Sequence, residues 1–142
     1  MHTQEEILAI WSACGVRLTK TRQALARLFA HTRTPLSVPD ILIALCAKGR
    51  KVNKTTIYRE LERMQRLGIV ASTQLGDRKQ YYELALRDHH HHLVCMRCEK
   101  VEDIEVNEAE LVREEQNASK QKQFMVLRHS LEFFGLCQQC QV

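Results

Sequence analysis

The strongest constraint on the fold of this chain is a pair of C-x-x-C motifs. Cys95 and Cys98 form the first motif, Cys137 and Cys140 form the second, and 38 residues separate the two. A C-x-x-C turn brings two thiolates to one metal ion, and two such turns supply the four ligands of a structural zinc site. A redox dithiol is the alternative for a single pair, but no thioredoxin-like βαβ pattern surrounds either motif. The sequence therefore predicts a domain cross-linked by zinc.

Four consecutive histidines stand just before the first C-x-x-C motif. In an extended strand successive side chains point to opposite faces, so His89 and His91 share one face while His90 and His92 share the other. Two H-x-H pairs predict two further metal sites, with solvated surface histidines as the alternative. A second strand is expected at 101–106, and its acidic residues are candidate oxygen ligands: Glu102, Asp103 and Glu105. A last strand, expected at 124–136, would point His129 inward.

Charge is divided unevenly along the chain. Residues 1–86 contain 14 Lys and Arg against 7 Asp and Glu, whereas residues 87–142 contain 7 against 10. A basic segment of this kind indicates a polyanionic partner, most simply nucleic acid, and the acidic segment suits divalent cations. We therefore expect two domains, 1–86 and 87–142, with a hinge at 85–88.

Helical patterns dominate the basic segment. Caps at Thr3, Ser37 and Asn53 predict helices from those residues to about Gly15, Gly49 and Gly68, and an apolar stripe predicts another helix at 19–31. Two strands, 69–75 and 80–86, are expected to form a hairpin around the turn at 76–79. Helices followed by a hairpin with a basic tip predict a winged helix-turn-helix domain. The fold class is thus α+β, with a small α/β domain after the winged helix.

The helix expected at 53–68 is the candidate DNA reader. Its apolar residues, including Ile57 and Leu61, must face the core, which leaves four polar or aromatic side chains outward: Thr55, Thr56, Tyr58 and Arg59. Such side chains can contact bases and phosphates in the major groove. Lys79 at the hairpin turn would contact the backbone. An ordinary solvated helix face is the alternative.

The absence of membrane and secretion signals, together with the cysteine usage, indicates where the protein works. No stretch approaches the length of a membrane span, and the first residues do not resemble a signal peptide, so we expect a cytoplasmic protein without a membrane partner. Cysteines in a reducing compartment are more often metal ligands and core thiols than disulfides. Cys14 and Cys46 lie in apolar helical patterns and are expected in the core.

Several motifs in order resemble the ferric uptake regulator (Fur) family. They are Leu18-Thr19-x-x-Arg22, Thr56-Ile57-Tyr58-Arg59-x-Leu61, Tyr82-Glu83-Leu84, the histidine run with its C-x-x-C, Arg128-His129-Ser130 and the terminal C-x-x-C. The resemblance spans nearly the whole chain. It implies a homodimeric, metal-activated transcription repressor, not an enzyme, whose second domain dimerises and whose operator is an A·T-rich inverted repeat in double-stranded DNA. It also adds Arg22 to the expected DNA contacts.

The resemblance also implies the role of each metal ligand. Cys95, Cys98, Cys137 and Cys140 would hold structural zinc. The regulatory site would consist of Glu83, His90, His92 and Asp103, and an additional site of His89, His91, Glu110 and His129. The family usually supplies one more regulatory histidine, but the matching position is Pro35 here, and His31 is a candidate replacement.

Ligand chemistry leaves the sensed metal open among Fe(II), Mn(II), Zn(II) and Co(II). The hard oxygens of Glu83 and Asp103 favour Fe(II). A zinc-uptake regulator and a peroxide sensor that oxidises its own histidines are alternatives within the same family. A zinc metalloenzyme and a metal-buffering protein are alternatives of a different class, and neither explains a basic winged helix.

Overall fold

The structure is a computed structural model that describes residues 3–76, 79–85, 87 and 89–142. The chain divides into two compact units, Met1–Asp88 and His89–Val142. The predicted hinge at 85–88 includes Leu86 and Asp88, which lie outside the described residues, so the domain boundary expected after Leu86 stays a prediction. Each unit is described separately below.

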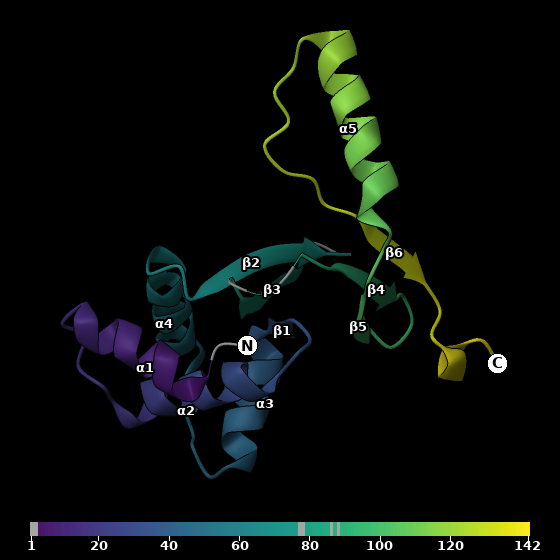
Figure 1. The fold of residues 1–142 in the computed structure, drawn as a ribbon. Coiled ribbons are helices and arrows are strands. Elements are labelled where there is room, and N and C mark those ends of the chain that lie inside the picture. The colour runs from purple at the N-terminus through teal and green to yellow at the C-terminus, as the bar shows by residue number, and fades with distance from the viewer. Residues whose placement is uncertain (1–2, 77–78, 86, 88) are drawn as a thin grey trace. The chain divides into compact units, whose positions relative to one another are not determined.

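Four helices make up most of the first unit (Figure 1). They are α1 (Gln4–Ala13), α2 (Lys20–His31), α3 (Val38–Ala47) and α4 (Lys54–Arg66). The predicted capping boxes are confirmed, because Thr3 exchanges hydrogen bonds with Glu6 and Ser37 exchanges them with Asp40. Gly49 and Gly68 follow α3 and α4 with φ angles of 74° and 68°, a left-handed conformation that favours glycine just after a helix.

A three-stranded antiparallel sheet completes this unit, in the order β1-β3-β2. The predicted hairpin is present as β2 (Val70–Leu75) and β3 (Lys79–Leu84), and its turn includes residues 77 and 78, which lie outside the described part of the chain. The third strand, β1 (Leu36–Ser37), pairs Leu36 with Tyr82. A strand of two residues is too short to show an alternating pattern, so the sequence does not indicate it.

The core of the first unit lies between the four helices and the sheet. Trp11, Phe29 and Ile41 are each at most 2% exposed. Helix α4 contributes Ile57, Leu61 and Met64, which recur at helical spacing and are also buried. Burial of this stripe fixes which residues of α4 face away from the core.

The second unit is a smaller α/β arrangement. Its sheet has the order β5-β4-β6, from β4 (His91–Cys95), β5 (Val101–Ile104) and β6 (Glu132–Gly135). Strand β4 is antiparallel to β5 and parallel to β6. Helix α5 (Glu108–Lys122) connects β5 to β6, and a 3₁₀ turn, η1 (Gln138–Cys140), follows.

The last strand is much shorter than we predicted. Residues 124–131 form no strand, and only Glu132–Gly135 pair with β4. Alternating apolar residues suggested one long strand, but Phe124, Met125 and Leu127 are 66%, 79% and 86% exposed. An alternating pattern indicates that one side of a segment will be buried, but it does not say what will bury it. Nothing within the described second unit packs over these three side chains.

Little of the second unit is buried. No residue of α5 is buried, and the buried side chains of the sheet include His91, His92 and Cys95. A unit whose interior is formed largely by histidine and cysteine has too little apolar surface for a conventional core. It depends instead on what those side chains bind and on what covers its exposed apolar residues.

Candidate metal centres and nucleic-acid interface

The four predicted zinc ligands lie together in the second unit. Cys95 ends β4, Cys98 follows in the turn, Cys137 comes directly before η1, and Cys140 is the last residue of η1. Their four sulfur atoms lie within 4.8 Å of one another, and Cys98 Sγ lies 3.7 Å from Cys137 Sγ. Sulfurs bound at 2.3 Å to a tetrahedral ion would lie roughly 3.8 Å apart. The cysteines therefore fit a four-thiolate zinc ion.

Hydrogen bonds and burial give the thiols of this cluster different pKa values. The backbone amide of Cys137 donates to Cys95 Sγ at 3.4 Å, the largest of the effects that lower the pKa of Cys95 to about 6. A side-chain hydrogen bond with Cys137 and then burial raise the pKa of Cys140 to about 12. Without a cation the cluster thus keeps some of its protons, whereas a bound divalent ion lets every sulfur ionise.

Arg97 supports the second C-x-x-C motif from outside the ligand set. Its Nη1 atom donates to the carbonyl of Cys140 at 2.9 Å and to that of Val142 at 3.3 Å. The amide of Met96 donates to the carbonyl of Gly135 at 2.8 Å. These bonds hold the first motif against the segment that carries the second.

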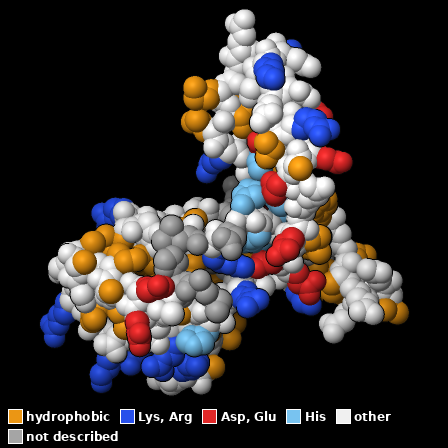
Figure 2. All heavy atoms as spheres, in the orientation of Figure 1, with side chains coloured by type: hydrophobic (Ala, Val, Ile, Leu, Met, Phe, Trp, Pro, Cys, Tyr) orange, Lys and Arg blue, Asp and Glu red, His pale blue; other side chains and the backbone are white. Residues whose placement is uncertain are grey.

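A second cluster forms around His89 and His91, which point to one face of the extended segment that contains β4. His89 Nε2 lies 2.8 Å from His129 Nε2, and His91 Nε2 lies 2.6 Å from a carboxylate oxygen of Glu108. One ligand atom from each residue lies within 4.8 Å of the others. Figure 2 shows several histidine side chains gathered in one patch of the visible surface. Three imidazoles and one carboxylate suit zinc or another first-row metal ion.

The carboxylate of this cluster is Glu108, where we expected Glu110. Residues two apart on a helix point about 200° apart, so the two side chains cannot face β4 together. Glu110 is exposed. The partly buried residues of α5 recur at helical spacing and show which face lies inward: Glu108, Leu111, Glu115 and Ser119.

Glu115 supports the histidine cluster and was not predicted. Its carboxylate lies 2.5 Å from His129 Nδ1, the ring nitrogen opposite the one that faces the cluster. Metal-bound histidines usually donate their second N–H to such a carboxylate, which fixes the ring and its tautomer. The seven-residue spacing from Glu108 is the sequence signal that would have identified it.

The predicted regulatory ligands come from both units. In the second unit, the rings of His90 and His92 lie 4.9 Å apart, and His92 Nε2 lies 3.9 Å from Asp103 Oδ1. These three residues form one group on the face of β4 that the additional cluster does not use. Glu83 belongs to the first unit, where its carboxylate accepts from Arg87 at 3.2 Å. Its place among the regulatory ligands stays a prediction.

His31 lies in an environment unlike that of a metal ligand. It ends α2, is exposed, and its Nδ1 atom lies 2.8 Å from the carbonyl oxygen of Arg27. It lines a cavity of about 480 Å³ between α2 and α3, together with Lys20, Lys48 and Arg50. Neighbouring positive charges disfavour cation binding. Pro35, at the position of the family's usual histidine, is buried.

The predicted DNA-reading residues lie on the outer side of α4. Tyr58 is 44% exposed, and Thr55 and Arg59 are exposed, while Thr56 is half-buried in the first turn. The Lys54 ammonium lies 5.8 Å from the centre of the Tyr58 ring. Lys79 is exposed at the start of β3. Positive and aromatic groups therefore share the face that the core leaves open.

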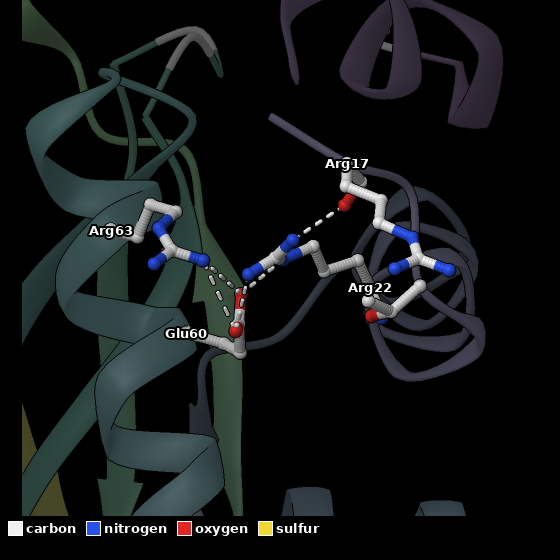
Figure 3. Close-up of polar contacts among 5 residues, drawn as sticks. Arg17, Arg22, Glu60 and Arg63 are labelled. Atoms are coloured by element: carbon white, nitrogen blue, oxygen red, sulfur yellow. Dashed lines mark hydrogen bonds and ion pairs between the residues drawn. The ribbon is translucent and has the colours of Figure 1, made fainter. Parts of the chain in front are cut away.

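Arg22 is directed into its own unit, which argues against its prediction as a DNA contact. Its Nε and Nη2 atoms donate to Glu60 of α4 at 2.7 and 2.9 Å, and its Nη1 donates to the carbonyl of Arg17 at 2.5 Å (Figure 3). The side chain is only 13% exposed. A family motif identifies such a residue as important, but it does not say which group the residue contacts.

The prediction that Cys14 and Cys46 are core residues is wrong, because both are exposed. Cys46 comes one position after the buried Leu45 of α3, and Cys14 is the C-cap residue at which α1 has already ended. None of the described helices is long and apolar enough to cross a membrane.

Comparison with known proteins gives consistent matches along the chain. The model of the Ferric uptake regulator family matches residues 13–134. The chain is 30% identical over 139 residues to the "Peroxide-responsive repressor PerR" of Staphylococcus epidermidis, a match that covers 98% of this chain and 91% of that protein. It is 29% identical over 140 residues to the protein of that name from Staphylococcus aureus, covering 99% and 93%.

Solved structures share the fold. The ferric uptake regulator of Helicobacter pylori, described as having three functional metal binding sites, matches with a TM-score of 0.81 at 22% identity, covering 99% of this chain and 95% of that one. The ferric uptake regulator of Vibrio cholerae matches with a TM-score of 0.77 at 24% identity, covering 91% and 98%.

Proposed function

This chain belongs to the ferric uptake regulator family and is a metal-responsive transcriptional repressor, and we propose that ferrous iron is the metal to which it responds. The observation that carries this proposal is the grouping of His90 and His92 with Asp103, which is the partner of His92 on the neighbouring strand β5. Two imidazoles with a carboxylate make a mixed nitrogen and oxygen site that suits Fe(II). Glu83, if it joins them, adds a second hard oxygen.

The proposed switch follows from which parts of the chain supply the ligands. His90, His92 and Asp103 would hold the metal in the second unit, and Glu83 would join them from the end of the winged helix. A ligand shared in this way favours only the arrangement of the two units that brings all four residues together. If that arrangement suits the operator, metal and DNA each strengthen the binding of the other by the same factor.

The proposed operator is an A·T-rich inverted repeat. A two-fold dimer places one α4 helix in each half-site, because the symmetry of the protein matches that of the DNA. Exposed apolar residues of the second unit support dimerisation through that unit: Phe124, Met125, Leu127, Phe133, Phe134 and Leu136. Such a concentration of apolar surface marks a protein contact.

The decisive test compares three histidine variants in operator binding with and without Fe(II). His90→Ala and His92→Ala should abolish the response to metal while leaving the dimer and the cysteine-bound zinc intact. His31→Ala is the matched control and should respond as the wild type does, because His31 lies among cations. A His90→Ala protein that still responds fully would exclude this group as the sensor.

The identity of the metal needs its own measurement, because Zn(II) and Mn(II) also accept this ligand set. Metal analysis of protein purified without added metal, followed by operator titration with Fe(II), Mn(II) and Zn(II), separates the iron regulator from a zinc-uptake regulator. Full repression by Zn(II) alone, at lower free concentration than Fe(II), would favour the zinc regulator.

A peroxide sensor is the second candidate, since the two curated relatives described above are named peroxide-responsive repressors. In that case, peroxide added to the iron-loaded protein should oxidise His90 or His92 and release DNA. Mass spectrometry of the peptides around these residues would detect the added oxygen. If peroxide also released DNA from the Mn(II)-loaded protein, without oxidation of either histidine, this candidate would be contradicted.

The repressor names of the relatives favour a regulator over the two alternatives of a different class. A metalloenzyme needs an open metal position beside a general base. A buffering protein would bind metal equally well with or without DNA. Linkage between metal and operator binding therefore separates the repressor from both.

A further inference from the structure

Glu60 occupies an unusual position on the DNA-reading helix. It follows Arg59 directly, yet its side chain is only 12% exposed, because it points toward Arg22 in the first turn of α2. Its two carboxylate oxygens accept from Arg22 at 2.7 and 2.9 Å, which is the two-bond fork that arginine forms best with a carboxylate. Figure 3 shows this fork between α4 and the segment that begins α2.

Arg22 extends the connection by one more bond. Its remaining Nη1 atom donates to the carbonyl of Arg17, in the loop that joins α1 to α2. Glu60 is thereby connected through one guanidinium to a backbone atom outside α4. A planar group held at both ends leaves α4 little freedom to rotate about its axis, because the fork fixes both distance and orientation.

The same carboxylate also receives Arg63, one turn further along α4. Arg63 Nη1 lies 3.3 and 3.4 Å from the two oxygens, and its side chain is 36% exposed. Glu60 thus forms ion pairs with two arginines in a unit whose net charge is strongly positive. Arginines bound to a carboxylate are less available to phosphates, and phosphate contacts supply the affinity that does not depend on sequence.

We propose that Glu60 is a specificity-determining residue of this repressor, which fixes α4 through Arg22 and keeps Arg22 and Arg63 away from backbone phosphates. Both effects widen the difference between operator and other DNA. The first maintains the orientation in which Tyr58 and Arg59 meet base edges, and the second lowers binding to any sequence. The inference rests on the proposed DNA-binding function, and it assigns Glu60 a positioning role without a base contact of its own.

The test uses metal-loaded full-length protein and two duplexes. One is selected by the wild type from a random pool, and the other has the same composition in scrambled order. Glu60→Gln should bind the scrambled duplex more tightly, with a salt slope steeper by about 0.9 for each arginine that reaches a phosphate. The ratio of selected to scrambled affinity should fall about ten-fold, the size of one good base contact.

Two further variants separate positioning from charge. Arg22→Gln removes the fork but frees no arginine to contact phosphate. The ratio of selected to scrambled affinity should therefore fall, while the affinity for the scrambled duplex should not rise. Glu62→Gln is the matched control, because it removes the same charge from the same helix at an exposed residue that makes no polar contact in the described structure. An equal effect of Glu62→Gln would show that net charge alone is responsible, and would overturn the inference.

Coupling between the partners gives an independent readout. The double variant Arg22→Gln with Glu60→Gln should lower the ratio no further than Glu60→Gln alone, because both changes break one fork. Additive losses would contradict the proposal that Arg22 and Glu60 act as a pair.

If Glu60→Gln fails to fold, Arg22→Lys keeps the positive charge but cannot form the two-bond fork, so it should still lower the ratio of selected to scrambled affinity. A wild type that prefers no duplex would contradict the proposed function itself, whereas an unchanged ratio in folded Glu60→Gln contradicts only this inference.

Discussion

Single residues decide which metal sites this chain can build. Glu108 and Glu110 have the same chemistry and lie two positions apart, yet only Glu108 lies 2.6 Å from a histidine of the cluster. The sequence identified the cluster, its three histidines and the need for a carboxylate. It did not identify which carboxylate, because the choice depends on the direction in which α5 presents its first turn.

Glu108→Gln should weaken metal binding at the histidine cluster, because it removes the negative ligand of the set. We expect a loss of at least about ten-fold in affinity, comparable with changes in groups that support metal ligands. Competition between the protein and a chelator, measured with the cysteine-bound zinc in place, gives this number. Glu110→Gln is the matched control and should bind as the wild type does; a loss for Glu110→Gln alone would restore the original prediction.

Cys98→Ser should remove the structural zinc and destabilise the second unit. Zinc bound to the four cysteines would join two motifs separated by 38 residues, and a cross-link that closes a loop of this length stabilises by roughly 4 kcal/mol in the chain-entropy model. Thermal unfolding and zinc analysis of the variant measure the effect. Cys46→Ser, at an exposed cysteine outside the cluster, is the control. Unchanged melting without zinc would show that the site does not stabilise the fold.

At the scale of elements, the first unit could be predicted well and the second less so. Caps, glycine ends and the buried stripe of α4 are local signals, and the structure contains all of them. The strand expected at 124–136 was wrong outside 132–135, since exposed Met125 and Leu127 follow the same alternation as buried residues. A sequence pattern indicates that a surface will be covered, but not whether its own chain covers it.

The exposed face of α4 makes a prediction about DNA discrimination. Tyr58→Ala should lose roughly 1 to 3 kcal/mol between operator and scrambled DNA, because a side chain that meets base edges distinguishes sequences. Lys79→Ala should weaken both duplexes alike and reduce the salt slope by about 0.9, the value for one phosphate contact. Binding titrations over a range of salt measure both. Equal losses on both duplexes for Tyr58→Ala would mean that Tyr58 does not read sequence.

At the scale of the whole molecule, the second unit is incomplete as a single copy. Helix α5 has no buried residue, and Leu127 is 86% exposed. Apolar surface of this kind is covered in a dimer, and the family to which the chain belongs is dimeric. We therefore expect a second copy of the chain to cover the exposed apolar residues of this unit.

Leu127→Glu should shift the protein from dimer to monomer, because it places a charge in the surface expected to be buried between copies. Sedimentation velocity at several protein concentrations would show the change. Ile43→Glu, at a residue of α3 that is 69% exposed, is the matched control and should leave the dimer intact. Persistence of the Leu127→Glu dimer at low concentration would place the interface elsewhere.

The position of the two C-x-x-C motifs also affects how the chain responds to proteases. The segment between them contains β5, all of α5 and β6, so zinc bound to the four cysteines would turn this segment into a closed loop. Residues 124–131 of this segment form neither helix nor strand and are mostly exposed, so they offer cleavage sites. A single cut there would leave two fragments joined through the metal, which should migrate as one species under native conditions and separate only after a chelator removes the zinc.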